Sequence, residues 1–344
     1  MFYRVPLFAL ASLAMVPLLA LGALFGGGWI WAALIYITTL SFLADEFTAL
    51  PGQAEPETTT AWADRLSVIL ALSHFALLAL GAWAVAGETG LTRPERIAAF
   101  FAFGLFLGQV SNANAHELIH RGSRMLHALG KWVYISLLFG HHTSAHPLVH
   151  HVHVATAADP NSARMGQSYY AWVPRAWIGS FREGLRAERT RQVRAGRSGW
   201  HNPYALYVGG ALALILLAAF CGPAVLLAYV GLCGHAQSQL LLSDYVQHYG
   251  LRRAMLPSGK PEPVGPRHSW NAPHWFTTLM MLAAPRHSDH HARPSTPYPQ
   301  LGLPDDAPLL PKSLPAMATL ALIPPVWRRV MDPRVARAQT LTGP

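Results

Sequence analysis

The sequence predicts an all-α fold, a bundle of six transmembrane helices with a histidine-rich helical cap on the cytosolic side. Three observations support this prediction. Long uncharged apolar runs recur along the chain, and only 12% of its residues are charged, about half the share found in soluble domains. The 18 histidines gather where apolar runs end. We therefore expect residues 1–344 to form a single membrane domain.

The first expected span is an apolar run long enough, as a helix, to cross a hydrocarbon core of about 30 Å. The first run also exceeds the roughly 7–15 apolar residues of a signal peptide. The expected spans are residues 5–25, 29–44, 66–86, 97–120, 204–220 and 224–248. Two other apolar pieces, 131–141 and 314–326, are too short or too rich in proline to cross.

Basic residues lie almost entirely in two segments that follow apolar spans. All but four of the 26 lysines and arginines fall in 121–202 or 249–344. The positive-inside rule places both segments in the cytosol. Because the positive charge is confined to these segments, we do not expect the chain to bind nucleic acid. The arginine-rich stretch 182–197 predicts a solvated amphipathic helix, whose functional interpretation is a docking surface for an acidic partner.

The cysteines offer no metal site. The sequence holds two, Cys221 and Cys233, both in apolar stretches. Without a Cys-x-x-Cys pair, thiolate zinc sites and cysteine-ligated iron–sulfur clusters are excluded, and a disulfide framework is excluded as well. Any metal site must therefore use other ligands, above all histidine.

The first histidine cluster is His116-Glu117-Leu118-Ile119-His120, an HExxH pattern at the end of the fourth expected span. Histidines at i and i+4 share one helical face about 6 Å apart, so two imidazoles can bind one metal ion. Taken alone, this pattern is also typical of zinc hydrolases that use the glutamate as general base.

Two further clusters have similar spacing. The second, at 146–151, has the spacing H-x3-H-H, which repeats the i, i+4 geometry and adds a third imidazole one position round the helix. The third, at 287–291, has histidines at i, i+3 and i+4, on one side of a helical turn. Between these clusters, Asp244 and His248 lie one turn apart at the end of the sixth expected span.

Isolated histidines at a membrane interface are usually amphipathic side chains without a ligand role. We interpret in this way His74, His127, His141, His142, His153, His201 and His235. His268 and His274 lie close to the third cluster. For these two, the same interpretation and a supporting role at a metal site both stay open.

Three clusters at ligand spacing, on one predicted side of the membrane, predict a metal site. Eight or nine imidazoles exceed what one ion with an open catalytic position can use, so two ions with four or five nitrogens each fit better. Imidazole suits iron, zinc and copper alike, and iron is favoured because it activates O2. Because neutral imidazoles leave the ions' charge uncompensated, we expect Glu117, Asp244 or Asp289 to bind metal or to orient rings by hydrogen bonds.

The segments HELIHR, HPLVHH, QHYG and RHSDHH resemble those of the bacterial membrane alkane 1-monooxygenases. That family has the patterns HExGH[KR], HNxxHH, [IV]EHYG and QRHSDHH. Stretches 151–168 and 268–274 are similar to the family as well, and the resemblance covers about residues 110–295. The distantly related fatty acid desaturases lack the HYG and RHSDHH segments.

The resemblance implies a di-iron enzyme of the bacterial inner membrane that hydroxylates linear alkanes at the terminal carbon with O2. It also implies that rubredoxin or ferredoxin, with its reductase, donates the electrons. Carried over to this sequence, the iron ligands are His116, His120, His146, His150, His151, His248, His287, His290 and His291. The sequence departs from the family pattern at Ile119, at 147–149, at Gln247 and at Pro285. These departures change the surroundings of the ligands and leave the ligands themselves in place.

Three alternatives stay open from the sequence. A related di-iron enzyme, either a fatty acid desaturase or a hydroxylase of aromatic methyl groups or other lipids, would use the same clusters. An intramembrane zinc protease would use His116, Glu117 and His120 but leave the later histidines idle. A metal transporter would place its polar groups near the membrane midplane, whereas these clusters lie at one edge.

Overall fold

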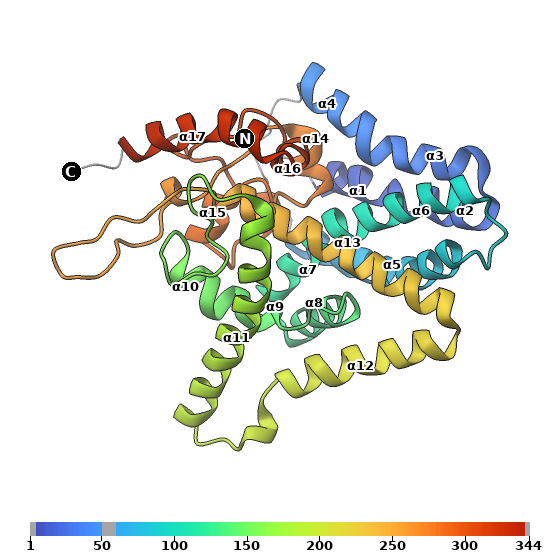
Figure 1. The fold of residues 1–344 in the computed structure, drawn as a ribbon, viewed down its shortest axis with the longest axis horizontal. Coiled ribbons are helices and arrows are strands. Elements are labelled where there is room, and N and C mark those ends of the chain that lie inside the picture. The colour runs from blue at the N-terminus through green and yellow to red at the C-terminus, as the bar shows by residue number, and fades with distance from the viewer. Residues whose placement is uncertain (1–4, 50–59, 341–344) are drawn as a thin grey trace.

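The structure is a computed structural model that describes residues 5–49 and 60–340. Figure 1 shows long helices side by side in one part of the molecule and shorter helices in the other. In the described ranges, the extended pairing consists of isolated bridges between Met255 and Pro261 and between Asn271 and Leu309. The all-α prediction is therefore confirmed.

The N-terminal part supplies most of the long helices. It contains α1 (Val5–Leu13), α2 (Met15–Phe25), α3 (Gly27–Ile35), the π-helix η1 (Tyr36–Leu40), α4 (Ser41–Phe47), α5 (Thr60–Ala86), α6 (Arg93–Leu105), the π-helix η2 (Phe106–Ser111) and α7 (Asn112–Ile119). Several of these elements follow one another without a break and form continuous helical stretches.

The middle part alternates short and long helices. It contains α8 (Arg124–Ser136), α9 (His142–Ala145), the π-helix η3 (His146–His150), α10 (His151–His153), α11 (Tyr169–Arg194), the 3-10 helix η4 (Gly199–His201), α12 (Tyr204–Phe220) and α13 (Pro223–Gln247). The C-terminal part contains the 3-10 helix η5 (Pro266–His268), α14 (Trp275–Met280), α15 (His287–Ala292), the 3-10 helix η6 (Tyr298–Gln300), α16 (Leu314–Ala321) and α17 (Pro324–Thr340).

Helices long and apolar enough to cross a membrane occur at five of the six expected places. They are Val5–Phe25, Gly27–Phe47, Thr60–Ala86, Arg93–Ile119 and Pro223–Gln247. The remaining helix, α12, is the fifth expected span; it has the expected bounds but only 17 residues. At a rise of 1.5 Å per residue it is about 26 Å long, which is shorter than the core of about 30 Å. The predicted count of six spans is therefore not confirmed.

Helix α13 lies at the centre of the packing, and helix α8 covers α7. Helix α13 packs against α5, α6, η2, α12 and α16, and Figure 1 shows it crossing the middle of the molecule. The turn before it uses Gly222, whose φ of 124° suits glycine, and Pro223 begins the helix. Helix α8 packs closely on α7, since a Cβ at Gly130 would lie 2.7 Å from the Cβ of Leu118.

The shorter predicted pieces fall into helices as well. Residues 131–136 belong to α8, and the apolar piece at 314–326 is divided between α16 and α17. The arginine-rich stretch forms the second half of α11, which ends at Arg194. Its arginines at 182, 186, 189, 191 and 194 are all exposed, so the predicted solvated helix is confirmed.

Candidate metal centre

The HExxH pattern lies where the fourth long helical stretch ends. His116 is on α7, and His120 is the residue directly after it. Their ring centroids are 5.1 Å apart, and both rings join the same group of candidate ligands. The predicted pairing of these rings is thus found in the structure.

The second cluster is arranged differently from the α-helical expectation. His146 and His150 are the ends of the π-helix η3, in which backbone hydrogen bonds join residues i and i+5 instead of i and i+4. As a result His146 groups with His151, at i+5, whereas His150 joins a different group. Pro147 has no N–H to donate, which interrupts α-helical hydrogen bonding at this point. The expected i, i+4 pairing is therefore wrong for this cluster.

The third cluster lies on α15 and divides between the same groups. His287 and His291, at i and i+4, join His150, whereas His290 joins the group of His116. His248, the residue directly after α13, completes the group of His287. All three rings were expected on one side of the turn, but His290 faces the other group.

The nine histidines predicted as ligands form two groups. The five-membered group consists of His116, His120, His146, His151 and His290. The four-membered group consists of His150, His248, His287 and His291. Within each group, candidate ligand atoms all lie within 4.8 Å of one another, so each group could hold one metal ion.

More ring nitrogens converge on one another than hydrogen bonding alone can explain. His146 Nε2 lies 2.7 Å from His116 Nε2 and 2.9 Å from His151 Nε2. In the other group, His287 Nε2 lies 3.0 Å from His248 Nε2 and 3.1 Å from His291 Nε2. An imidazole nitrogen has one in-plane position, for a proton or for a lone pair. It cannot form two good hydrogen bonds at once, so a shared cation accounts better for the convergence.

The spacing of these nitrogens fits a metal ion. Imidazole nitrogens bind ions such as zinc at about 2.0–2.1 Å. Two nitrogens that share one such ion would lie roughly 3.0–3.4 Å apart, close to the separations observed. The nitrogen donors suit iron, copper and zinc, and the residues present therefore fit the two iron ions implied by the resemblance.

Burial keeps most of these rings neutral, which is the form that binds metal. Outside the candidate membrane spans, burial and then neighbouring rings hold the pKa values of seven of them well below the ordinary range. These are His120, His146, His151, His248, His287, His290 and His291. For His150, burial lowers the pKa, but the charge and hydrogen bond of Asp159 outweigh burial and raise it.

Asp159 is a residue of the candidate site that the sequence analysis missed. Its side chain is wholly buried, and its Oδ2 lies 2.9 Å from Nδ1 of His150. Because a carboxylate only accepts, His150 Nδ1 carries the proton and Nε2 faces the other rings. Burial raises the pKa of Asp159, but His150 and Ser162 outweigh burial and lower it. Such carboxylates fix the orientation of ligand rings.

The three carboxylates named from the sequence have other partners. Glu117 accepts from the backbone N–H of Tyr298 and pairs with Arg121 at 3.1 Å. Asp289 pairs with Arg293 at 2.6 Å. Asp244 accepts from Asn161 at 2.7 Å. Within the described ranges, none of the three is hydrogen-bonded to a ring of either group.

Among the other histidines, His142 is closest to the site. Its ring stacks on His146 with centroids 4.9 Å apart, so its interpretation as an unrelated side chain is incomplete. The side chain of His268 bonds to Glu262 at 3.0 Å, whereas its backbone is hydrogen-bonded to the ring of His248. His74 bonds to Ser136, and His235 stacks on Phe100. These last contacts are those of ordinary packed side chains.

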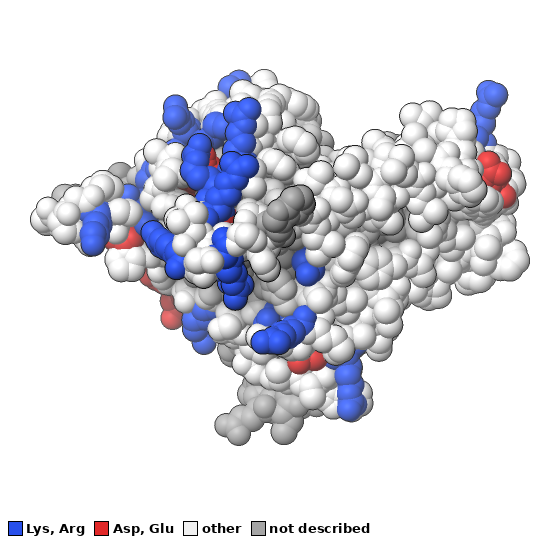
Figure 2. Space-filling view, turned by 90° about the horizontal axis from the view of Figure 1, so that it is seen from below, with Lys and Arg blue, Asp and Glu red and all other residues white. Residues whose placement is uncertain are grey.

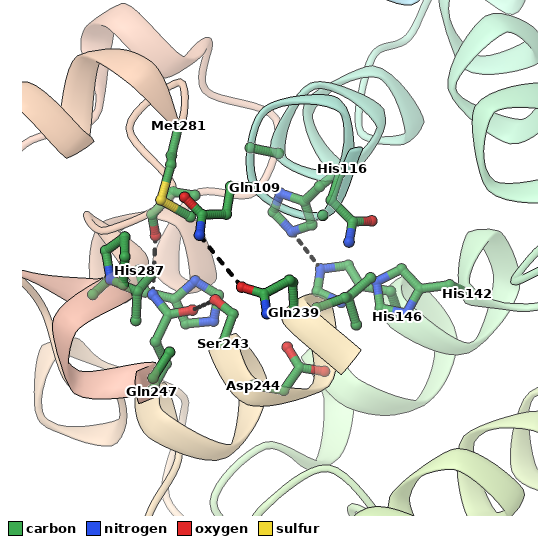
Figure 3. A pocket seen from close by; sticks show the side chains of 18 of the residues that line it. Gln109, His116, His142, His146, Gln239, Ser243, Asp244, Gln247, Met281 and His287 are labelled. Atoms are coloured by element: carbon green, nitrogen blue, oxygen red, sulfur yellow. Dashed lines mark hydrogen bonds between the residues drawn. The ribbon is translucent and has the colours of Figure 1, made fainter. Parts of the chain in front are cut away.

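A pocket lies between the ends of the long helices and borders both groups (Figure 3). His116 and His146 of the five-membered group line it, as does His287 of the four-membered group. Its apolar wall includes Leu240, Met281, Leu314 and Ala318, and its polar wall includes Gln109, Asn112, Gln239, Ser243, Asp244 and Gln247. We call this pocket the chamber.

Gln247 shows what one departure from the family pattern does. Its Nε2 donates to the carbonyl of Ala284 at 3.0 Å, and its Oε1 accepts from Ser243 at 2.8 Å. An ionised glutamate, the residue implied by the family pattern, has no N–H to donate. The amide therefore joins α13 to the loop before α15 beside the chamber.

Comparisons with known proteins show which families the sequence is similar to. A model of the fatty acid desaturase family matches residues 95–320. Alkane 1-monooxygenase 1 of Pseudomonas aeruginosa is 37% identical over 245 residues, which are 70% of this chain but 64% of that protein. Alkane 1-monooxygenase 1 of Alcanivorax borkumensis is 32% identical over 337 residues, 93% of this chain and 81% of that protein.

A relative with a different printed activity is also similar. The hydroxylase component of the xylene/toluene monooxygenase of Pseudomonas putida is 27% identical over 319 residues, which are 89% of this chain and 82% of that protein. Similarity therefore extends beyond relatives that are named for alkanes.

Proposed function

The chain belongs to the fatty acid desaturase family and, within it, to the alkane 1-monooxygenases, and from this premise we propose its reaction. We propose that it hydroxylates the terminal carbon of linear alkanes to give primary alcohols. One atom of O2 enters the C–H bond and the other leaves as water, which consumes two electrons and two protons.

The observation that carries this proposal is the contact of one chamber with both histidine groups. His116 and His287, one from each group, line the same space. A substrate carbon in the chamber would therefore lie beside both groups. Two iron ions, bound by the five-membered and the four-membered group, would supply the activation of O2 that attack on an alkane C–H bond needs.

The chain's own residues would position the substrate and exclude water. The apolar side chains of Leu240, Met281 and Leu314 offer contacts to a hydrocarbon. The rings of His146 and His287 are almost completely buried, so bulk water is kept from the reacting end. Asp159 would hold the ring of His150 in one orientation throughout.

The proposed topology places this centre on the cytosolic side of the bacterial inner membrane. The exposed arginines of α11 support it, because basic segments remain in the cytosol. Figure 2 shows Lys and Arg gathered over one part of a face that is otherwise nearly uncharged. We propose that this surface binds an acidic electron donor such as rubredoxin, and that raised salt slows electron transfer by screening the attraction. A salt-independent rate would contradict the docking surface.

The decisive experiment combines metal analysis with turnover. The protein, purified in lipid nanodiscs and reconstituted with iron, is supplied with reduced rubredoxin, O2 and linear alkanes from octane to hexadecane. We expect about two iron ions per chain and primary alcohols as products, identified by mass spectrometry. A single zinc ion without alcohol formation would contradict the proposal.

A second candidate substrate rests on similarity to the xylene/toluene hydroxylase component. The same site would then hydroxylate a methyl group on an aromatic ring. Offering xylene and dodecane in one reaction separates the candidates, because the product of the preferred substrate dominates. Formation of an alkene instead of an alcohol would favour desaturation.

A further inference from the structure

A second hollow, which we call the groove, lies beside the chamber. Segments of the helical stretches Gly27–Phe47, Arg93–Ile119 and Pro223–Gln247, together with α16, form its walls. Phe42 and Leu322, on its lining, are 42% and 39% exposed, so the groove reaches the molecular surface. Because most of its walls belong to candidate membrane spans, we expect this surface to face the lipid.

The lining of the groove suits a hydrocarbon. It includes Ile37, Phe42, Leu105, Leu242 and Leu322, and no charged side chain lines it among the described residues. The remaining polar groups are hydroxyls and two amides. A linear apolar chain dissolved in the bilayer could enter such a groove without desolvating a charge. We therefore take the occupant to be the apolar chain of the substrate.

The groove and the chamber meet at two glutamines. Gln109 and Gln239 line both spaces, together with Pro315 and Ala318. Nε2 of Gln109 donates to Oε1 of Gln239 at 3.3 Å, and Figure 3 shows this bond crossing the space between α13 and the helix that carries His116. The bonded pair therefore lies on the boundary between the groove and the chamber.

The backbone around the pair is built for close contact. A Cβ on Gly108 would lie 2.5 Å from the Cβ of Gln239, so glycine is needed for η2 to pass α13 this closely. Gln109 lies within the π-helix η2, a type of irregularity that is often found at functional sites. The Oε1 of Gln109 is buried without a hydrogen-bond partner. Polar groups within membrane spans are costly, and they usually mark a functional position.

We infer that Gln109 and Gln239 form a gate that admits the apolar chain of the substrate from the groove into the chamber. This inference rests on the proposed function for the identity of the chain. When the gate is shut, the amide of Gln109 donates to the amide of Gln239, and the pair separates the lipid side from the candidate metal ligands. When a chain passes, the amides separate and the bond between them is lost.

The gate can be tested without turnover by photolabelling. The probe is linear dodecane carrying a diazirine near one end, added to the full chain in lipid nanodiscs. Mass spectrometry then locates the label at groove residues such as Phe42 and Leu322, or at chamber residues such as Ser243 and Met281. The measured quantity is the initial rate of chamber labelling relative to groove labelling.

Opening the gate should change this ratio in one direction. In Gln109→Ala and in Gln239→Ala, which alter different helices, we expect chamber labelling to rise about fivefold, the effect of losing one neutral hydrogen bond. Gln237→Ala is the matched control. Gln237 is on α13, bonds to Leu137 and Trp177, and lines neither space, so the ratio should stay unchanged.

The labelling ratio and the metal content together decide whether the gate exists. An unchanged ratio in both alanine variants, with their metal content retained, overturns the gate, and so does the absence of label from the groove in every protein. A raised ratio in a metal-loaded enzyme that forms no alcohol supports the gate and contradicts the proposed function. The failure of one proposal can thus be distinguished from the failure of the other.

Discussion

The two histidine groups use the same side chain but lie in different surroundings. In the five-membered group, His116, His120 and His151 are partly exposed, whereas all rings of the four-membered group are buried. Within the described ranges, a carboxylate bonds to a ring of the four-membered group alone, through Asp159. The difference teaches that the two candidate metal positions are not equivalent, since one is enclosed and anchored by an anion and the other is more open.

The groups are nevertheless linked through the chain. The consecutive residues His150 and His151 belong to different groups, and so do His290 and His291. A shift of either segment would therefore move a ligand in both groups. This linkage predicts that the groups keep a fixed separation while they differ in how readily each releases its ion.

The largest expected effect comes from removing one ligand in each group. We expect His146→Ala and His248→Ala each to abolish alcohol formation, because the proposed reaction uses both groups. Each should also lower the iron content from about two to about one ion per chain. Metal analysis and product analysis of the purified variants measure these effects.

The control for this pair is His153→Ala, which removes an exposed histidine beside the second cluster and should leave both ions in place. Retention of two ions in both ligand variants would contradict the assignment of the groups. Loss of both ions in either variant would show that the groups are one cooperative site.

The next effect concerns the anion that distinguishes the groups. We expect Asp159→Asn to weaken iron binding in the four-membered group about 10–100-fold, the usual result of removing a carboxylate that orients a ligand ring. Titration with iron under anaerobic conditions measures it. Asp289→Asn is the matched control, because Asp289 is next to a candidate ligand but pairs with Arg293 instead of a ring. Equal weakening in the two variants would remove the proposed asymmetry.

The pairings within α-helices were predictable from the sequence. His116 with His120, and His287 with His291, follow from the i, i+4 spacing of an α-helix. The pairing of His146 with His151 was not predictable, because the π-helix at 146–150 changes the number of residues per helical turn. Spacing alone does not reveal a π-turn, although Pro147 inside the cluster was a signal that regular bonding stops there.

Contacts made by loop residues, or between residues on facing helices, could not be predicted from the sequence. Asp159 reaches His150 because the chain turns back after α10, and no periodic pattern encodes such a turn. Its position within the stretch 151–168, which resembles the family, was the available signal. Gln109 and Gln239 are 130 residues apart, so their contact depends on how two spans pack. The spans themselves follow from apolar length, and α12 differs because it falls short of that length.

A smaller effect should appear when metal is removed gradually. We expect a chelator to withdraw iron in two phases, with the five-membered group emptied first, because three of its rings are partly exposed. The time course of release, followed by the colour of the chelated iron, measures the phases. His248→Ala should retain the fast phase and lose the slow one. Release in a single phase from the unaltered protein would argue that burial does not distinguish the groups.

The smallest expected effect tests whether the asymmetry depends on how Asp159 is held. The hydroxyl of Ser162 donates to Oδ2 of Asp159 at 2.7 Å and accepts from the N–H of Ala155 at 2.8 Å. Ser162→Ala keeps the carboxylate of Asp159 but removes one of the hydrogen bonds that orient it. We expect iron binding in the four-membered group to weaken about fivefold, the effect of one lost hydrogen bond.

The control is Ser198→Ala, which removes a serine–histidine hydrogen bond of 2.9 Å at an exposed position and should leave iron binding unchanged. The size of the Ser162→Ala effect relative to Asp159→Asn separates two causes. A clearly smaller loss of iron binding in Ser162→Ala means that the charge of Asp159 anchors the four-membered group. Ser162 then only improves the orientation of the carboxylate. Equal losses would mean that the fold of the loop at 155–162 sets the ring's position and that the charge adds little.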